Sequence, residues 1–176
     1  ISRPILKIYG DPNHLPAYGR KLKSLAGDND RIIFAGGYEN AQVEEMLMGI
    51  DVLVVPSQWY ETGPLVTLEA FASRTPVVAT DLPNMSNQVT HELNGLLFTP
   101  DDAADLARQL QRILDEPDLL RRLAANIGTI KTFEEEMREI MQLYGTVLNS
   151  NVETSYSTIA PVLRATTKPS LGGTRV

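Results

Sequence analysis

Short apolar runs alternate with helix-like segments along the first hundred residues, and this alternation constrains the fold more than any other feature. The runs are rich in Val, Ile and Leu, which is typical of strands buried on both faces of a parallel sheet. Parallel strands need crossover helices of one hand. The sequence therefore predicts an α/β fold, a Rossmann-like parallel sheet with helices on both faces. The expected strands are 5–9, 31–34, 51–55, 76–79 and 95–98, and the expected helices are 18–26, 43–47, 65–72, 103–114, one from Pro117, and 133–148.

The length and composition of the chain fit one domain with one core. The chain has 176 residues, of which 43% are hydrophobic, and this is enough for one substantial core but not for two. From Ser150 onward the periodic pattern stops, and nine of the 27 residues are Ser or Thr. Such a segment buries too little apolar surface to order itself. We therefore expect a domain over residues 1–149 and a flexible tail over residues 150–176.

The charge of the chain excludes several classes of partner. The net charge is -6 and Lys and Arg do not cluster, whereas nucleic acids and anionic membranes require dense positive charge. No apolar run is long enough to span a membrane. There is no cysteine, so disulfides and thiolate metal sites are excluded. We expect a cytoplasmic protein without a nucleic-acid partner, with attachment to the inner face of a membrane as an alternative.

The histidines and acids do not show the spacing of a metal site. His14 and His91 lie among turn-forming polar residues and are expected to be ordinary surface histidines. No two His, Asp or Glu positions share a helix face at metal-binding spacing. Ser57 lacks a nearby His and the glycine pattern of a hydrolase elbow, so nucleophilic catalysis has little support. We therefore expect neither a metal nor a cofactor.

Residues 56–69 concentrate the chemistry of the sequence. They follow a buried strand and run through a loop into a helix that begins near Pro64. Ligands of open α/β sheets bind where loops leave the carboxyl ends of strands. The free N–H groups at the helix start, from about Leu65 and Val66, carry roughly half a positive charge and suit a diphosphate. Gly63 lets the backbone approach such a ligand closely.

Two glutamates flank this helix start. Glu61 lies in the loop and Glu69 on the first turns of the helix, so both can face one crevice. A carboxylate accepts two hydrogen bonds, so Glu69 can take both hydroxyls of a ribose while Glu61 faces the sugar of a nucleotide diphosphate sugar. Glutamates at this spacing also occur by chance, and acids near a helix start stabilise the helix itself. The position directly after a buried strand favours the functional interpretation.

The two aromatic residues before Glu61 allow two interpretations. Trp59 and Tyr60 can stack on a ligand, because they directly precede the first acid. Aromatic packing underneath the loop is at least as good an explanation. The sequence leaves both open.

Four segments of the chain together resemble a known family. They are residues 51–56, 61–72, 76–81 and 94–97. With them the chain is similar, over about residues 5–148, to the C-terminal half of the group 1 retaining glycosyltransferases of the GT-B fold. The resemblance implies a nucleotide-sugar-binding domain. It also implies metal-independent transfer of a sugar from a nucleotide diphosphate sugar to a hydroxyl acceptor, with retention.

The same resemblance implies roles for individual residues. Glu61 corresponds to the first acid of the E-x7-E signature, near the donor sugar, and is the expected catalytic residue. Glu69 corresponds to the second acid, on the ribose. The loop at residues 35–39 falls where such enzymes hold the base. The expected donor-binding residues are Thr62, Gly63, Leu65, Val66, Glu69, Gly36 and Gly37.

The chain departs from the family pattern at several positions. Pro83 and Asn84 stand where many relatives have two glycines, and Asn87 stands where an acid is usual. Arg74 occupies a helix end that relatives fill with glycine, and a left-handed backbone there costs a side chain roughly 1 kcal/mol. These departures favour a second interpretation, a scaffold or binding module whose catalytic use is lost. A related epimerase or phosphorylase of the same fold is a nearer alternative.

The resemblance also implies parts that these 176 residues do not contain. The first strand of the domain, the Arg and Lys that clamp the diphosphate in relatives, and the N-terminal acceptor-binding domain are expected upstream of Ile1. The helix at 133–148 resembles the segment that crosses back to that partner domain. We therefore expect the chain to bind a nucleotide sugar and to show weak or no turnover alone.

Overall fold

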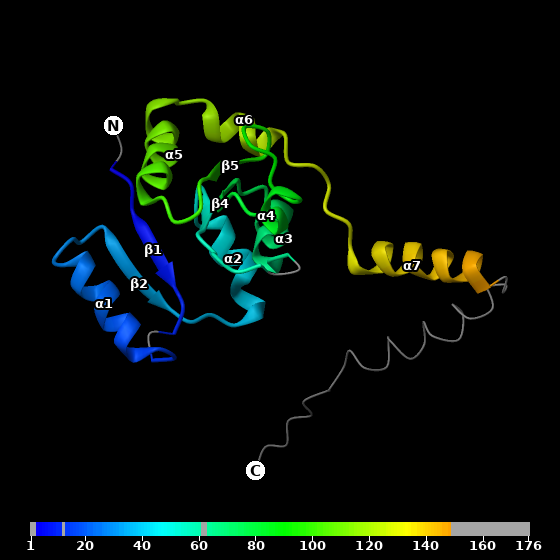
Figure 1. Cartoon of the computed structure of the whole chain (residues 1–176), viewed down its shortest axis with the longest axis horizontal. Coiled ribbons are helices and arrows are strands. Elements are labelled where there is room, and N and C mark those ends of the chain that lie inside the picture. The colour runs from blue at the N-terminus through cyan, green and yellow to red at the C-terminus, as the bar shows by residue number, and fades with distance from the viewer. Residues whose placement is uncertain (1–2, 12, 61–62, 149–176) are drawn as a thin grey trace, which may run out of the picture. The chain divides into compact units, whose positions relative to one another are not determined.

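A computed structural model of the chain describes residues 3–11, 13–60 and 63–148 (Figure 1). The tail expected at 150–176 lies outside these residues. The chain divides into two compact units, Ile1–Thr129 and Ile130–Val176. The helix expected at 133–148 belongs to the second unit.

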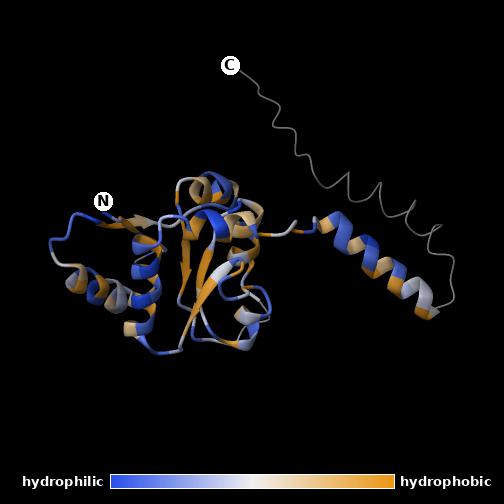
Figure 2. Cartoon of the chain, turned by 90° about the horizontal axis from the view of Figure 1, so that it is seen from above, coloured by the Kyte–Doolittle hydropathy of each residue, from blue (hydrophilic) through white to orange (hydrophobic). Residues whose placement is uncertain are grey.

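A three-stranded parallel sheet forms the centre of the first unit. Its strands are β3 (Leu53–Val55), β4 (Val77–Thr80) and β5 (Gly95–Phe98), in the order β3-β4-β5. All four residues of β4 are buried because it pairs on both sides and is covered by helices. Figure 2 shows the hydrophobic character of these strands. The strands predicted at 51–55, 76–79 and 95–98 are confirmed; β3 is shorter than predicted and is mostly half-buried, whereas β4 is fully buried.

Helices cover this sheet and complete its core. They are α3 (Leu65–Ala72), α4 (Pro83–Ser86), α5 (Ala103–Asp115) and α6 (Leu119–Ala125). The side chain of Asp102 caps α5 by accepting a hydrogen bond from the Asp105 N–H, as the acidic first turn predicts. The helix expected from Pro117 begins two residues later. One core cluster joins the sheet to α6 through Val78, Leu96, Phe98, Leu119 and Leu123.

A second, two-stranded parallel sheet precedes this layer. Strand β1 (Leu6–Tyr9) pairs with β2 (Ile32–Gly36), and α1 (Pro16–Ala26) connects them. The turn η1 (Asn40–Gln42) and helix α2 (Val43–Met48) then lead to β3. Among the described residues no ladder joins β1 to β3. The predicted α/β architecture of parallel strands and helices is confirmed, but its strands form two sheets, in which β1 and β3 each pair on one side only.

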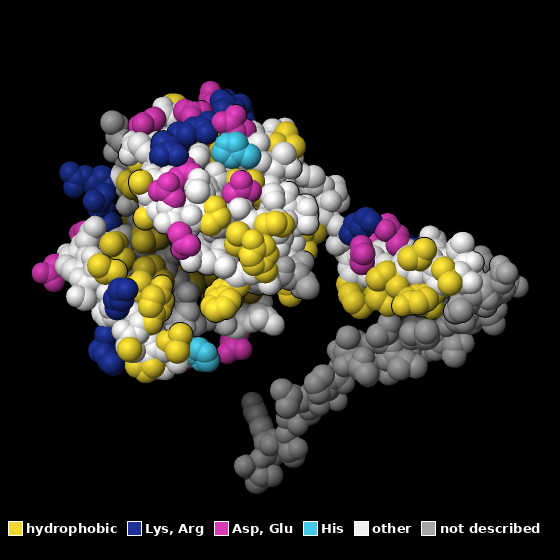
Figure 3. Space-filling model, in the orientation of Figure 1, with side chains coloured by type: hydrophobic (Ala, Val, Ile, Leu, Met, Phe, Trp, Pro, Cys, Tyr) yellow, Lys and Arg dark blue, Asp and Glu magenta, His cyan; other side chains and the backbone are white. Residues whose placement is uncertain are grey.

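Two further elements are the helices α4 and α7. Residues 80–94, where the sequence predicts neither a helix nor a strand, contain the short helix α4, which Pro83 opens at a position that tolerates proline. In the second unit, α7 (Phe133–Leu148) carries apolar side chains that lie exposed, as Figure 3 shows. Among the described residues, no helix is both long and apolar enough to cross a membrane.

Candidate functional site

The loop after β3 leads directly into the start of α3. Gly63 has φ 142°, a backbone conformation that side chains rarely adopt, and Pro64 is extended before the helix begins at Leu65. The predicted helix start is confirmed. The Thr67 N–H donates to the Pro64 carbonyl at 3.1 Å. The N-cap residue, Pro64, makes no side-chain cap at this end of α3. The first N–H groups of a helix, here those of Leu65 and Val66, have no partner within the helix.

Of the two acids expected at the site, Glu61 and Glu69, the structure describes only Glu69. Glu69 lies four residues after the first residue of α3, and its side chain is exposed. Glu61 and Thr62 lie outside the described residues, so the prediction that both acids face one crevice stays a prediction. The exposed carboxylate of Glu69 on α3 can accept hydrogen bonds from two hydroxyl groups.

The side chain of Gln88, which follows α4 in the chain, approaches the same glycine. A Cβ atom added to Gly63 would lie 2.6 Å from Gln88 Nε2. Gln88 Oε1 and both amide atoms of Asn84 are buried, and they make no hydrogen bond with the described residues. The same holds for the hydroxyl oxygens of Thr67 and Thr80. Buried polar atoms without partners are rare in native proteins, so this polar edge is unusual.

Two of the positions noted as departures from the family pattern differ in their burial. Asn84, which stands where relatives have glycine, is half-buried, whereas Asn87 is exposed. The sequence did not reveal the contact of Gln88 with Gly63. These residues are 25 positions apart, and only the return of the chain through α3 and β4 brings them together.

The predicted base-binding loop forms a cavity at the carboxyl ends of β1 and β2. Gly36, the last residue of β2, has φ 80°, a conformation that favours glycine, and Gly37 follows it. The rings of Tyr9 and Tyr38 meet edge to face with centroids 5.9 Å apart. The cavity measures about 330 Å³, within the range of small-ligand sites. Its lining includes Lys7, Tyr9, Gly37, Tyr38, Gln42 and Glu45.

The turn at the floor of this cavity is held by its own side chains. Glu39 and Gln42 bond reciprocally, with the Glu39 N–H donating to Gln42 Oε1 at 3.0 Å. Lys7 Nζ donates to the Gly49 carbonyl at 3.4 Å. Sequence spacing did not indicate Tyr9 as a lining residue. Its pairing with Tyr38 depends on the register of β1 against β2.

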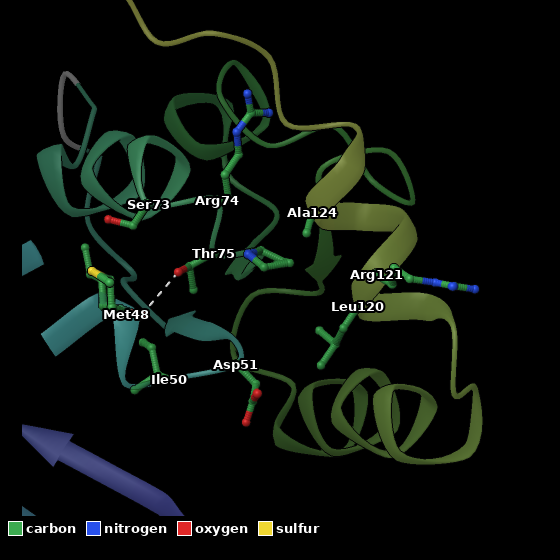
Figure 4. A pocket seen from close by; sticks show the side chains of 11 residues that line it. Met48, Ile50, Asp51, Ser73, Arg74, Thr75, Leu120, Arg121 and Ala124 are labelled. Carbon is green, nitrogen blue, oxygen red and sulfur yellow. Dashed lines mark hydrogen bonds between the residues drawn. The ribbon is translucent and has the colours of Figure 1, made fainter. Parts of the chain in front are cut away.

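A larger cavity of about 390 Å³ lies at the opposite edge of the three-stranded sheet. Asp51 and Pro76, which line it, precede β3 and β4, so it opens at the amino ends of these strands. Figure 4 shows the lining side chains, with the hydrogen bond from the Thr75 hydroxyl to the Leu47 carbonyl at 3.3 Å. Because α3 begins at the carboxyl edge, this cavity is separate from the candidate donor site.

Arg74 at the rim of this larger cavity is left-handed. Its φ is 59°, which confirms the strained position anticipated for a side chain there. Its guanidinium donates a hydrogen bond to the Ile127 carbonyl. Arg74 therefore ties the turn after α3 to the segment that follows α6, a role that glycine cannot perform.

The ionisable groups of the first unit serve mainly structural contacts. The pKa of Asp105 is lowered, first by the Thr99 backbone N–H and then by the Thr99 hydroxyl, which donate at 2.8 and 2.7 Å. The Leu97 N–H donates to His91 Nδ1 at 2.9 Å, so the His91 ring braces β5. Within 3–11, 13–60 and 63–148, no three His, Asp or Glu residues gather as a metal site would require.

Residues 3–128 match the family described as glycosyl transferases group 1. The chain belongs to this family. It is 34% identical over 141 residues to a lipopolysaccharide core biosynthesis mannosyltransferase, LpsB of Rhizobium meliloti, covering 75% of this chain and 39% of LpsB. The match to this family agrees with the alternation of strands and helices that the sequence predicts.

Solved structures agree with the family assignment. Sucrose-phosphate synthase of Thermosynechococcus elongatus is 31% identical, with a TM-score of 0.68. The match covers 82% of this chain and 38% of the synthase chain. HepE of Anabaena, solved in complex with UDP, has the same fold at 20% identity and a TM-score of 0.63, over 92% of this chain and 41% of its own. The α/β, Rossmann-like, GT-B fold class is thus confirmed. The chain spans about two fifths of the length of these relatives.

Proposed function

We propose that this group 1 glycosyl transferase chain binds the nucleotide diphosphate sugar in the C-terminal, donor-binding half of a retaining glycosyltransferase. One observation carries the proposal: α3 opens at the carboxyl edge of β3 without a side-chain cap, and Glu69 is exposed on the same helix. Helix N-termini bind phosphate through their free N–H groups and the helix dipole. HepE, which shares this fold, was solved in complex with UDP, and this supports nucleotide binding as the function.

Each part of the ligand has a candidate partner. The N–H groups of Leu65 and Val66 receive the diphosphate, and Gly63 admits it closely. Glu69 accepts the ribose hydroxyls, and the cavity lined by Tyr9 and Tyr38 takes the base. In the E-x7-E interpretation, Glu61 orients the donor sugar and supports positive charge near its ring, while the helix dipole stabilises the leaving diphosphate. This assignment needs no metal or cofactor.

The reaction itself needs groups from outside this chain. The unpaired edges of β1 and β3 support the expectation of a further parallel strand between them. An acceptor-binding domain would hold the acceptor, whose hydroxyl receives the sugar. We therefore expect donor binding but weak or no transfer from these 176 residues alone.

Calorimetric titration of the 176-residue chain with UDP, GDP and ADP tests donor binding. Each is paired with a sugar nucleotide, UDP-glucose, GDP-mannose or ADP-glucose. Saturable binding of at least one pair is expected. A folded chain that binds none of the six nucleotides would contradict the proposal. It would favour the scaffold module, an interpretation that the buried Asn84 amide also supports.

The ribose contact gives a sharper test. Glu69→Gln should weaken binding of the preferred nucleoside diphosphate about tenfold, because a hydrogen bond to a charged group contributes about 1.5–3 kcal/mol. The wild type should prefer the ribose form over its 2′-deoxy analogue, and Glu69→Gln should lose that preference. Glu44→Gln, an exposed acid on α2, is the matched control and should change neither affinity. Equal discrimination in Glu69→Gln would remove Glu69 from the site.

A further inference from the structure

The loop between β3 and α3 presents two uncovered aromatic rings. Trp59 is 79% exposed and Tyr60 is 78% exposed, the highest values among the described large hydrophobic side chains. Of the two interpretations that the sequence leaves open, packing underneath the loop does not fit rings that are this exposed. Leu65, at the start of α3, is also 72% exposed.

Connectivity places these rings beside the candidate donor site. Trp59 follows the last residue of β3 by four positions and precedes the first residue of α3 by six. Both ends of the loop are thus anchored at the carboxyl edge of the sheet, where Leu65 and Val66 present their N–H groups. The residues directly beyond the rings are the expected catalytic Glu61 and the turn at Gly63.

The size and chemistry of the pair favour a sugar ring over a protein partner. Each aromatic side chain offers roughly 150–250 Å² for burial, whereas a stable protein interface buries about 800 Å² per partner. A pyranose has an apolar face of C–H groups that packs on an aromatic face, and hydroxyls at its rim that need polar neighbours. Gln58, next to Trp59 in the sequence, has a polar side chain of this kind.

We propose that Trp59 and Tyr60 form an aromatic platform for the sugar ring of the donor, and that they select sugar nucleotides over the free nucleoside diphosphate. This inference rests on the proposed function and adds the residues that read the transferred group. Trp59 supplies the larger flat surface, and Tyr60 adds a hydroxyl that can bond a sugar oxygen.

The chain contains a single Trp, so its fluorescence reports on the platform alone. The wild-type chain is titrated with UDP and UDP-glucose, and likewise with GDP and GDP-mannose and with ADP and ADP-glucose. For the pair that binds, the sugar nucleotide should change the intensity and wavelength of Trp59 emission, while the matching nucleoside diphosphate should change neither. An identical response to both members of the pair would overturn the inference.

Three variants separate stacking from general effects, with affinity measured by calorimetry. Trp59→Ala should weaken the sugar nucleotide about tenfold, or 1.4 kcal/mol, and leave the nucleoside diphosphate unchanged within about twofold. Trp59→Phe, which keeps a ring, should recover most of the loss. Leu25→Ala removes a similarly exposed apolar side chain from α1 and should change nothing. Because Trp59 is exposed, its removal should leave the unfolding midpoint in place.

The outcomes distinguish the two proposals. If the wild type binds none of the six nucleotides, the proposed function fails and the platform with it. If nucleotides bind but Trp59→Ala weakens both members of the pair equally, or weakens neither, only the platform is overturned. If the wild type self-associates in sedimentation and Trp59→Ala abolishes this, the occupant is a second copy and the sugar platform is likewise overturned.

Discussion

The two sheets of the first unit are built from similar residues but are buried very differently. In the three-stranded sheet, Val78 and Leu96 are fully buried. In the two-stranded sheet, Leu6 is 49% exposed and Ile33 is 42% exposed. Strand pairing alone does not explain the difference, because β5 pairs on one side only, as β1 and β2 do. Leu96 of β5 is buried because Leu119 and Leu123 of α6 belong to the same core cluster. An apolar strand sequence therefore indicates where a strand can be buried, and the packing around it decides whether it is.

Truncation of one leucine in each sheet should show the contrast most strongly. Leu96→Ala should destabilise the chain by about 2–5 kcal/mol, because it opens a cavity in the cluster of β4, β5 and α6. Leu6→Ala should cost less than about 1 kcal/mol, since half of its side chain already meets water. Urea unfolding followed by circular dichroism measures both. Equal losses would refute the idea that the three-stranded sheet carries most of the stability.

One glycine in each sheet region offers a matched comparison of packing. A Cβ on Gly95 would lie 2.3 Å from the Val77 carbonyl oxygen and 2.7 Å from Val89 Cγ1, so Gly95→Ala should cost about 1–3 kcal/mol. Gly37 has nothing within 4 Å of its Cβ position, so Gly37→Ala should be almost neutral. The unfolding free energies of both variants decide the matter. A neutral Gly95→Ala would mean that β5 shifts freely.

An acid-dependent effect should be confined to the three-stranded layer. The Asp105 carboxylate accepts bonds from the Thr99 N–H and hydroxyl, which lowers its pKa. A pKa lowered by folding contributes stability above the ordinary carboxyl pKa of about 4, and this is lost as pH falls through the lower folded value. The stability gap between wild type and Asp105→Asn should therefore narrow from pH 6 to pH 3. A gap that is constant with pH would show that this carboxylate does not titrate with folding.

The smallest expected effect separates strain from bonding at Arg74. Arg74→Ala loses the hydrogen bond to the Ile127 carbonyl but keeps a left-handed side chain. Arg74→Gly loses the same bond and relieves the strain, so it should be more stable than Arg74→Ala by about 1 kcal/mol. Thermal unfolding of the two variants side by side measures this difference. The reverse order would show that the backbone at position 74 is not strained.

Much of the fold was readable from local patterns. The β-branched runs that became β3 and β4 identified buried parallel strands, and Pro64 with the apolar residues after it marked the start of α3. The interruption between β1 and β3 was not predictable in this way, because pairing depends on which strands are adjacent in space. The short helix α4 was missed since its residues are dominated by turn signals.

The candidate site was predictable only where it is continuous in sequence. The glycine, the helix start and Glu69 lie within one short segment, so their spacing predicted their placement. The Tyr9–Tyr38 contact and the approach of Gln88 to Gly63 join distant segments, and only the packed chain creates them. Exposure of Trp59 was equally hidden, because a ring beside a polar loop can be either covered or open.

Because the Gln88 side chain lies close to Gly63, the residue at one of these positions limits which residues fit at the other. Any residue larger than glycine at position 63 meets the end of the Gln88 side chain, and the positive φ adds a backbone cost that a shorter residue at position 88 cannot relieve. Mutant libraries that aim to alter ligand preference at this edge therefore gain more by keeping glycine and varying position 88 together with position 84.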